Sequence, residues 1–183
     1  MALFDIAHDR LQPLEGGYVN SKYDRGGPTN FGLSSKFLNS CNLRGDSIVK
    51  TLDDNGDGMI SAEEIKNIKP EESAQVYKIY FWLTHRYGEL KDQELANNIF
   101  DFGVHAGNYK ANILLQKSLN EIMIEKIMED GLIGNNTLAA ANNNANVIER
   151  FKEKRRQFYK AVVAKNPTQE RYLKGWLARV DKK

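Results

Sequence analysis

Apolar residues recur at intervals of three and four positions along most of this 183-residue chain. That spacing gathers them on one face of a helix, whereas the strict alternation typical of strands is nearly absent. The pattern therefore predicts an all-α fold. The expected helices cover residues 3–14, 35–41, 71–87, 95–106, 111–122, 136–162 and 172–180.

Residues 16–32 interrupt the helical pattern. They contain five glycines and one proline, which favour turns because glycine tolerates positive φ and proline cannot continue a helix. We expect a loop or a tight hairpin here. It follows the first helix, which Pro13 and the Gly16–Gly17 pair bring to an end.

The composition is that of an ordinary globular protein, with 41% hydrophobic and 27% charged residues. The length fits one domain, or one domain with a small appendage. Cys41 is the single cysteine, so no disulfide can form within the chain and the fold does not depend on an oxidising compartment.

The net charge of +2 hides an uneven distribution. Residues 150–183 carry 12 lysines and arginines against three acidic residues. A long basic C-terminal helix is expected to attract a polyanion such as an anionic wall polymer or lipid headgroups. A solvated helix face with no ligand explains the same charges equally well.

Residues 53–64 follow the twelve-residue pattern of an EF-hand calcium loop. Calcium takes six to eight oxygen ligands, which this pattern supplies from alternating positions of one tight loop. Gly58 falls at the sixth position, where the loop turns sharply. The expected ligands are the side chains of Asp53, Asn55, Asp57, Ser61 and Glu64 and the backbone carbonyl of Met59.

The role of such a calcium ion follows from its surroundings. Sensor EF-hands work in pairs, and the sequence contains one loop, flanked by short helices over 47–52 and 62–68. We therefore expect a structural calcium ion that rigidifies an insertion, with no cofactor needed for chemistry. The alternative is an acidic turn that binds no metal.

Two carboxylates and a hydroxyl fall close together near the N-terminus. Glu15 lies at the end of the first helix, Asp24 follows nine positions later, and Thr29 comes five positions after Asp24. An acid, a carboxylate that holds water and a hydroxyl are the groups that hydrolyse a glycosidic bond. Taken alone, a glutamate at a helix end is more often a solvated surface residue.

The run EGGYVN, followed by DRGGPTNFGL, resembles the signature of glycoside hydrolase family 108, a family of N-acetylmuramidases from phages and bacteria. The resemblance implies a lysozyme-like helical fold with Glu15 as the catalytic acid. The order Glu15, Asp24, Thr29 also resembles that of phage-type lysozymes, although the gap from Asp24 to Thr29 is one residue shorter. Tyr18 and Asn30 are the substrate-binding candidates in this segment.

The second half resembles the predicted peptidoglycan-binding region of the same family, in the segments 99–107, 115–119, 130–138 and 173–179. The resemblance implies a catalytic part over 1–92, which includes the calcium loop, and a peptidoglycan-binding part over 93–183. Asp101 and His105 are its candidate substrate contacts. The alternatives are a helix cap or a salt bridge for Asp101 and a structural role for His105.

These features lead to an expected activity, hydrolysis of the β-1,4 bond between N-acetylmuramic acid and N-acetylglucosamine in peptidoglycan. Glu15 would protonate the leaving oxygen, kept protonated where Tyr18 or Phe31 excludes water. Asp24 would stay ionised and Thr29 would help to orient water. The alternatives are a lytic transglycosylase that uses Glu15 alone, and a calcium-dependent wall-binding or secretion accessory without catalysis.

The expected partner is the peptidoglycan glycan strand, bound by a monomer, with no nucleic acid. Polar residues interrupt the apolar run at the N-terminus, namely Asp5, His8, Asp9 and Arg10, so we expect no cleavable signal peptide. No other window approaches the length of a membrane span. The protein would be made in the cytoplasm and reach the wall through a holin or a dedicated export route.

Overall fold

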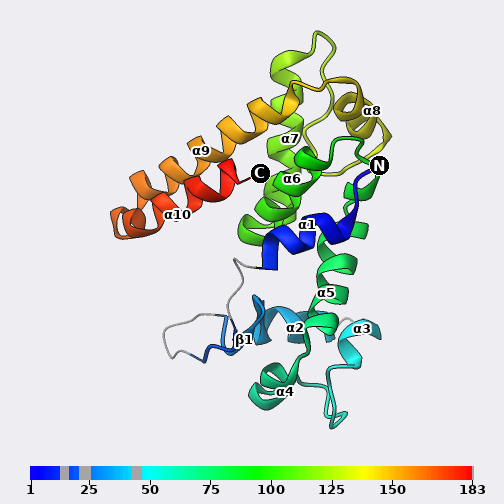
Figure 1. The fold of residues 1–183 in the computed structure, drawn as a ribbon, viewed down its shortest axis with the longest axis vertical. Coiled ribbons are helices and arrows are strands. Elements are labelled where there is room, and N and C mark those ends of the chain that lie inside the picture. Colours follow the sequence, from blue (N-terminus) through cyan, green and yellow to red (C-terminus); the bar gives the residue numbers. More distant parts are fainter. Residues whose placement is uncertain (13–16, 21–25, 43–46, 183) are drawn as a thin grey trace. The chain divides into compact units, whose positions relative to one another are not determined.

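The computed structural model describes residues 1–12, 17–20, 26–42 and 47–182. The described residues are mostly helical, which confirms the expected all-α fold (Figure 1). The helices are α1 Phe4–Leu11, α2 Ser35–Asn42, α3 Ser47–Lys50, α4 Ala62–Asn67, α5 Pro70–Tyr77, α6 Gln93–Ala106, α7 Asn108–Ile122, α8 Asn135–Asn143, α9 Val147–Lys165 and α10 Glu170–Asp181. Short π or 3-10 segments cover Lys78–Leu83, Tyr87–Glu89 and Pro167–Gln169, and the strands are β1 Thr29–Asn30 and β2 Leu33–Ser34.

The chain divides into two compact units, His8–Tyr80 and Met1–Ala7 with Phe81–Lys183. We call them the hairpin unit and the helical unit. The functional division expected at residues 92 and 93 stays a prediction. Among the described residues, no helix has the length and apolar character that a membrane crossing requires.

The hairpin unit contains the small sheet that the glycine-rich segment builds. Strands β1 and β2 pair antiparallel, with Thr29 opposite Ser34 and Asn30 opposite Leu33. Phe31 and Gly32 join them with φ of 46° and 75°, the left-handed values that suit a two-residue hairpin. The core of this unit consists of buried aliphatic side chains, including Leu33, Leu38, Val49, Ile65 and Val76.

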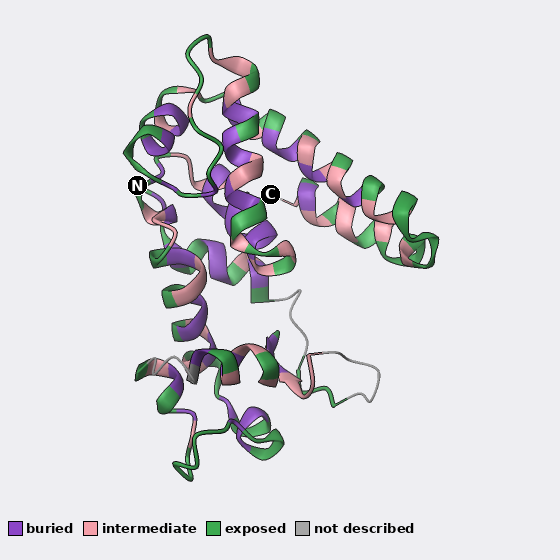
Figure 2. Ribbon diagram, turned by 180° about the vertical axis from the view of Figure 1, so that it is seen from behind, coloured by how far each residue is buried: buried purple, intermediate pink, exposed green. Residues whose placement is uncertain are grey.

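The helical unit packs α6 against α7 and α9, and α10 against α9. The buried residues of α6 run along most of the helix (Figure 2). Aromatic rings fill much of this core, and Phe102 meets Phe151 and Tyr159 edge to face. Such contacts add to the free energy gained by burying apolar surface.

The helix expected over 136–162 is in fact two helices, α8 and α9, separated at Asn144–Asn146. The amide of Asn144 donates to the carbonyl oxygen of Ala140 at 2.8 Å. Because an asparagine side chain competes with backbone donors for such carbonyls, the asparagine tract ends the first helix.

The helix expected over 71–87 also ends early. Helix α5 passes into a π-helical segment, Lys78–Leu83, and the chain then turns. Arg86 has a φ of 56°, in the left-handed region that ends helices. The apolar spacing alone does not distinguish α-helical from π-helical turns.

Candidate active site and its surroundings

Glu15 and Asp24 lie outside the described residues. The described residues next to them include Tyr18, which is 37% exposed, and Thr29, which is half-buried. Val19 and Thr29 form a bridge of two backbone hydrogen bonds, at 2.8 and 2.9 Å. The segment that follows Glu15 is therefore paired with the first strand of the hairpin.

Three contacts fix the hairpin itself. The amide of Asn30 is buried and donates to the carbonyl oxygens of Ile65 and Lys66, at 3.0 and 3.2 Å. The hydroxyl of Tyr77 donates to the carbonyl oxygen of Phe31 at 2.9 Å. Asn30 thus anchors β1 to α4, and its role in substrate binding stays a prediction.

The turn before β1 requires glycine at position 27. Gly27 has a φ of 77°, and a Cβ there would lie 2.5 Å from the Oγ atom of Ser35. The hydroxyl of Thr29 donates to the carbonyl oxygen of Gly27 at 3.0 Å. An oxygen that donates in this way can still accept a hydrogen bond from water, which is the chemistry expected of Thr29.

The loop over 53–64 is shaped by hydrogen bonds from its own backbone. Gly58 N donates to Asp53 Oδ2 at 2.9 Å, and Met59 N donates to Asp57 Oδ1 at 2.8 Å. Asp57 N donates to Asn55 Oδ1, also at 2.8 Å. These bonds turn three of the expected ligand side chains toward the loop's own backbone.

Glu64, the last expected calcium ligand, serves as a helix cap. Ser61 N donates to Glu64 Oε2 at 2.7 Å, and Glu64 N donates to Ser61 Oγ at 3.3 Å, a capping box at the start of α4. Burial opposes ionisation of Glu64, but hydrogen bonds from Ser61, Asn55 and Asp54 outweigh it and lower its pKa. Within the described part of the chain, no three His, Cys, Asp or Glu side chains converge as a metal site.

Asp101 lies in a buried ion cluster of the helical unit. Its Oδ2 accepts from Arg155 Nη2 at 2.6 Å and its Oδ1 from Arg179 Nη2 at 2.8 Å. Arg155 has no exposed surface and also donates to Asn98 Oδ1 at 2.9 Å. The structure therefore contains the salt bridge expected as one alternative for Asp101, and its contact with sugar stays a prediction.

His105 lies one helical turn after Asp101 on α6. Its Nδ1 is 3.0 Å from the hydroxyl of Tyr159, and its ring is tilted against Trp176. The pKa of His105 falls to about 4, because its neighbours displace water from part of the ring and because Arg179 is nearby, with Asp101 acting in the opposite sense. His105 is exposed to solvent in part, and because its pKa is lowered the imidazole is neutral at pH 7.

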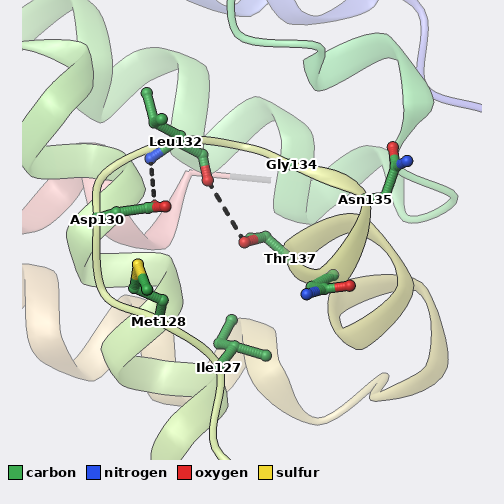
Figure 3. A pocket seen from close by; sticks show the side chains of 8 residues that line it. Ile127, Met128, Asp130, Leu132, Gly134, Asn135 and Thr137 are labelled. Atoms are coloured by element: carbon green, nitrogen blue, oxygen red, sulfur yellow. Dashed lines mark hydrogen bonds between the residues drawn. The ribbon is translucent and has the colours of Figure 1, made fainter.

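A small pocket of about 250 Å³ lies where the loop over 123–134 meets α8 (Figure 3). Asp130 Oδ1 accepts from Leu132 N at 2.8 Å, and the carbonyl oxygen of Leu132 faces the hydroxyl of Thr137. The loop is held from behind by Gln116, which donates to Asp130 Oδ1 at 2.8 Å and accepts from Gly131 N at 2.8 Å.

Sequence reasoning singled out neither Gln116 nor the two arginines of the ion cluster. Each position carries one sequence signal, a polar residue among the buried positions of a helix. Gln116 follows the buried Leu115, and Arg155 continues the apolar series of α9. A polar group placed there must be bonded inside the protein. The partners were not predictable, since Arg155 and Asp101 are 54 positions apart.

Comparison with known proteins identifies the family. Residues 9–107 match the family model of glycosyl hydrolase 108, more than half of the chain. The chain belongs to glycosyl hydrolase family 108. The family match includes Glu15, Asp24 and Thr29, so the resemblance carried by the EGGY segment is confirmed.

The family 108 region is followed by a second match, to the predicted peptidoglycan domain, over residues 110–181. The solved structure of Brucella abortus SagA is similar to this chain, with 26% sequence identity, a TM-score of 0.73, and coverage of 97% of this chain and 89% of SagA. No curated protein matches the chain. A glycosyl hydrolase region joined to a peptidoglycan domain supports a peptidoglycan hydrolase.

Proposed function

We propose that this family 108 protein hydrolyses the β-1,4 bond between N-acetylmuramic acid and N-acetylglucosamine, with Glu15 as the general acid. The observation that carries the proposal is the family match over residues 9–107, because it spans the whole EGGY segment and the hairpin after it. The peptidoglycan domain match over 110–181 supports the choice of substrate.

In this mechanism Glu15 protonates the glycosidic oxygen as the bond breaks, and positive charge develops on the sugar ring. Asp24 stays ionised and stabilises that charge or positions the attacking water. Support for the part played by Thr29 comes from its bonding, since its hydroxyl donates to the Gly27 carbonyl and keeps acceptor capacity for water. The anchored hairpin would hold that hydroxyl in a constant position.

The test is the digestion of purified peptidoglycan by the wild-type protein and by Glu15→Gln, with the soluble products identified by mass spectrometry. Products with reducing muramic acid ends, formed by the wild type and lost in Glu15→Gln, are expected. Glu71→Gln, on an exposed residue of α5, is the matched control and should digest normally. Products with anhydromuramic ends would show that the protein is a lytic transglycosylase and not a hydrolase. The absence of digestion at any dose would favour a binding protein without catalysis.

We also propose that residues 53–64 bind one calcium ion of structural importance. The donor set supports this, because side-chain oxygens of Asp53, Asn55 and Asp57 already fold into the loop and are hard ligands of the kind calcium prefers. Glu64 would give up its capping bonds to provide the last two oxygens. Calcium would supply charge neutralisation and rigidity there, with no part in bond cleavage.

Thermal unfolding with and without calcium tests this site. An ion present at 100 times its Kd stabilises the folded state by about 2.7 kcal/mol, so calcium should raise the Tm by several degrees. Glu64→Gln should abolish the increase, whereas Glu63→Gln, on the exposed neighbour, should retain it. An unchanged wild-type Tm at millimolar calcium would show that the loop does not bind the metal.

A further inference from the structure

A stack of aromatic rings crosses from α9 to α10 in the helical unit. Tyr159 and Trp176 lie with ring centroids 5.3 Å apart and planes 26° apart. Tyr172 extends the stack along α10, with its ring centroid 5.9 Å from that of Trp176 and the two planes 28° apart. Exposure rises along the stack, since Tyr159 is buried, Trp176 is half-buried and Tyr172 is 44% exposed. The stack therefore joins the core to the surface.

A cavity of about 280 Å³ opens beside this stack, and we call it the aromatic pocket. Residues of α6, α7, α9 and α10 and of the short segment before α10 line it, all within the helical unit. Its walls combine the rings of Phe158, Tyr159 and Trp176 with the polar side chains of His105, Lys110 and Gln169. The volume is slightly below the range of about 300–1,000 Å³ for small-molecule sites, so it suits one small ring rather than a chain.

The chemistry of this lining fits a sugar. A pyranose ring presents C–H groups on its faces and hydroxyl or amide groups on its edge, so it can lie on an indole while its edge is hydrogen-bonded. Trp176 offers a half-buried ring, and His105 and Gln169 offer hydrogen-bonding groups nearby. Sites of this kind are mostly apolar, with a few polar groups that fix the orientation of the ligand.

The charge of the lining narrows the choice of sugar. Lys110 is cationic, and none of the described residues that line the aromatic pocket is acidic. His105 is neutral at pH 7, because partial burial and the nearby Arg179 lower its pKa. The aromatic pocket therefore complements a sugar that carries one negative charge.

We propose that the aromatic pocket binds an N-acetylmuramic acid unit whose lactyl carboxylate is free, as on a glycan strand without its peptide stems, with the sugar ring against Trp176 and the carboxylate at Lys110. The choice of ligand rests on the proposed function, because it takes peptidoglycan as the substrate class. N-acetylglucosamine has the same ring and acetamido group without the carboxylate, so it should bind less tightly. This assignment gives the peptidoglycan domain a defined ligand and a defined contact for it.

Tryptophan fluorescence provides a direct test. The chain has two tryptophans, and Trp82 is only 2% exposed, so Trp82→Phe leaves Trp176 as the single reporter. Titration of this variant with N-acetylmuramic acid should give a saturable change in emission, and N-acetylglucosamine should bind about three- to tenfold more weakly. Retention of near-wild-type circular dichroism would establish that the variant is folded.

Paired lysine variants test the contact with the carboxylate. In the Trp82→Phe background, Lys110→Gln should weaken N-acetylmuramic acid binding about three- to tenfold, whereas Lys117→Gln, exposed on the same helix, should not change it. Equal affinities for the two sugars, an equal loss in both lysine variants, or no saturable change would overturn the proposal. Because a monosaccharide contains no glycosidic bond to cleave, the titration is independent of the outcome for Glu15→Gln.

Discussion

The substitution Asp101→Asn tests the ion cluster in the centre of the helical unit. It keeps the shape of the side chain and removes its charge. Arg155, which is fully buried, would lose its anionic partner at 2.6 Å, and Arg179 would lose a partner at 2.8 Å. A buried guanidinium cannot shed its proton, so the positive charge stays without compensation.

Removing one partner of a buried ion pair costs about 3–5 kcal/mol. The Asp101 side chain is 7% exposed and that of Arg155 is fully buried, so solvent screening reduces this value little. We therefore expect Asp101→Asn to lower the free energy of unfolding by about 3–5 kcal/mol. The matched control is Glu121→Gln, because Glu121 pairs with Lys154 and its side chain is 51% exposed; it should cost less than about 1 kcal/mol.

Urea unfolding followed by tryptophan fluorescence measures both values. The pH dependence adds a second check, because burial raises the pKa of Asp101 but Arg155 and Arg179 outweigh it and lower the pKa overall. A lowered pKa contributes stability that is complete above the unfolded value of about 3.9 and is lost as the pH falls through the folded value. The difference between wild type and Asp101→Asn should thus be constant from pH 5 to 8 and should shrink below about pH 4.

Three results would refute this reasoning. The first is a decrease in the free energy of unfolding of less than about 1 kcal/mol for Asp101→Asn. The others are a difference between wild type and Asp101→Asn that changes between pH 5 and 8, and a further decrease in the free energy of unfolding when Arg155→Met is added. The double variant should instead recover part of the stability, because it removes the buried, uncompensated charge of Arg155 and puts an apolar side chain in its place.

Two further predictions concern backbone positions. Asn30→Ala removes two hydrogen bonds, to the carbonyl oxygens of Ile65 and Lys66 in α4. We expect the free energy of unfolding to fall by about 1–3 kcal/mol in urea unfolding, and an unchanged midpoint would contradict the anchoring role. Gly131 has a φ of 76°, and a Cβ there would lie 2.4 Å from the ring of Tyr109; Gly131→Ala should cost about 1–2 kcal/mol. Gly134→Ala is its control, since nothing lies within 4 Å of that Cβ, and an equal loss in both variants would refute the argument from backbone strain.

The sequence could predict those features of the fold that depend on neighbouring residues. Helices α6 and α7 follow the apolar spacing that predicted them, and the glycine-rich segment yields a hairpin at Phe31 and Gly32. The break at Asn144–Asn146 was missed because the apolar residues keep their spacing on both sides of it. The hydrogen bond from the side-chain amide of Asn144 to a backbone carbonyl does not change the periodicity of the apolar residues.

The same distinction explains the sites. The turn over 53–64 could be predicted from the sequence because its residues are consecutive, and the hydrogen bonds within it join residues at most nine positions apart. Calcium binding there stays a prediction. The ion cluster depends on Asp101 meeting arginines 54 and 78 positions away. Only the packing of α9 and α10 beside α6 brings these residues together, and a single sequence contains no record of that packing.

The ion cluster and the aromatic pocket are parts of one structure. Arg155 Nη2 lies 2.6 Å from Asp101 Oδ2 and 3.4 Å from the hydroxyl of Tyr159, and that hydroxyl is 3.0 Å from His105. A chain of polar contacts thus runs from the buried carboxylate to the wall of the aromatic pocket. Hydrogen bonds of fixed geometry add to the apolar packing and orient the Tyr159 hydroxyl and the His105 ring. The buried charges therefore have a use beyond stability, because they hold Tyr159 and His105, whose rings both contact Trp176.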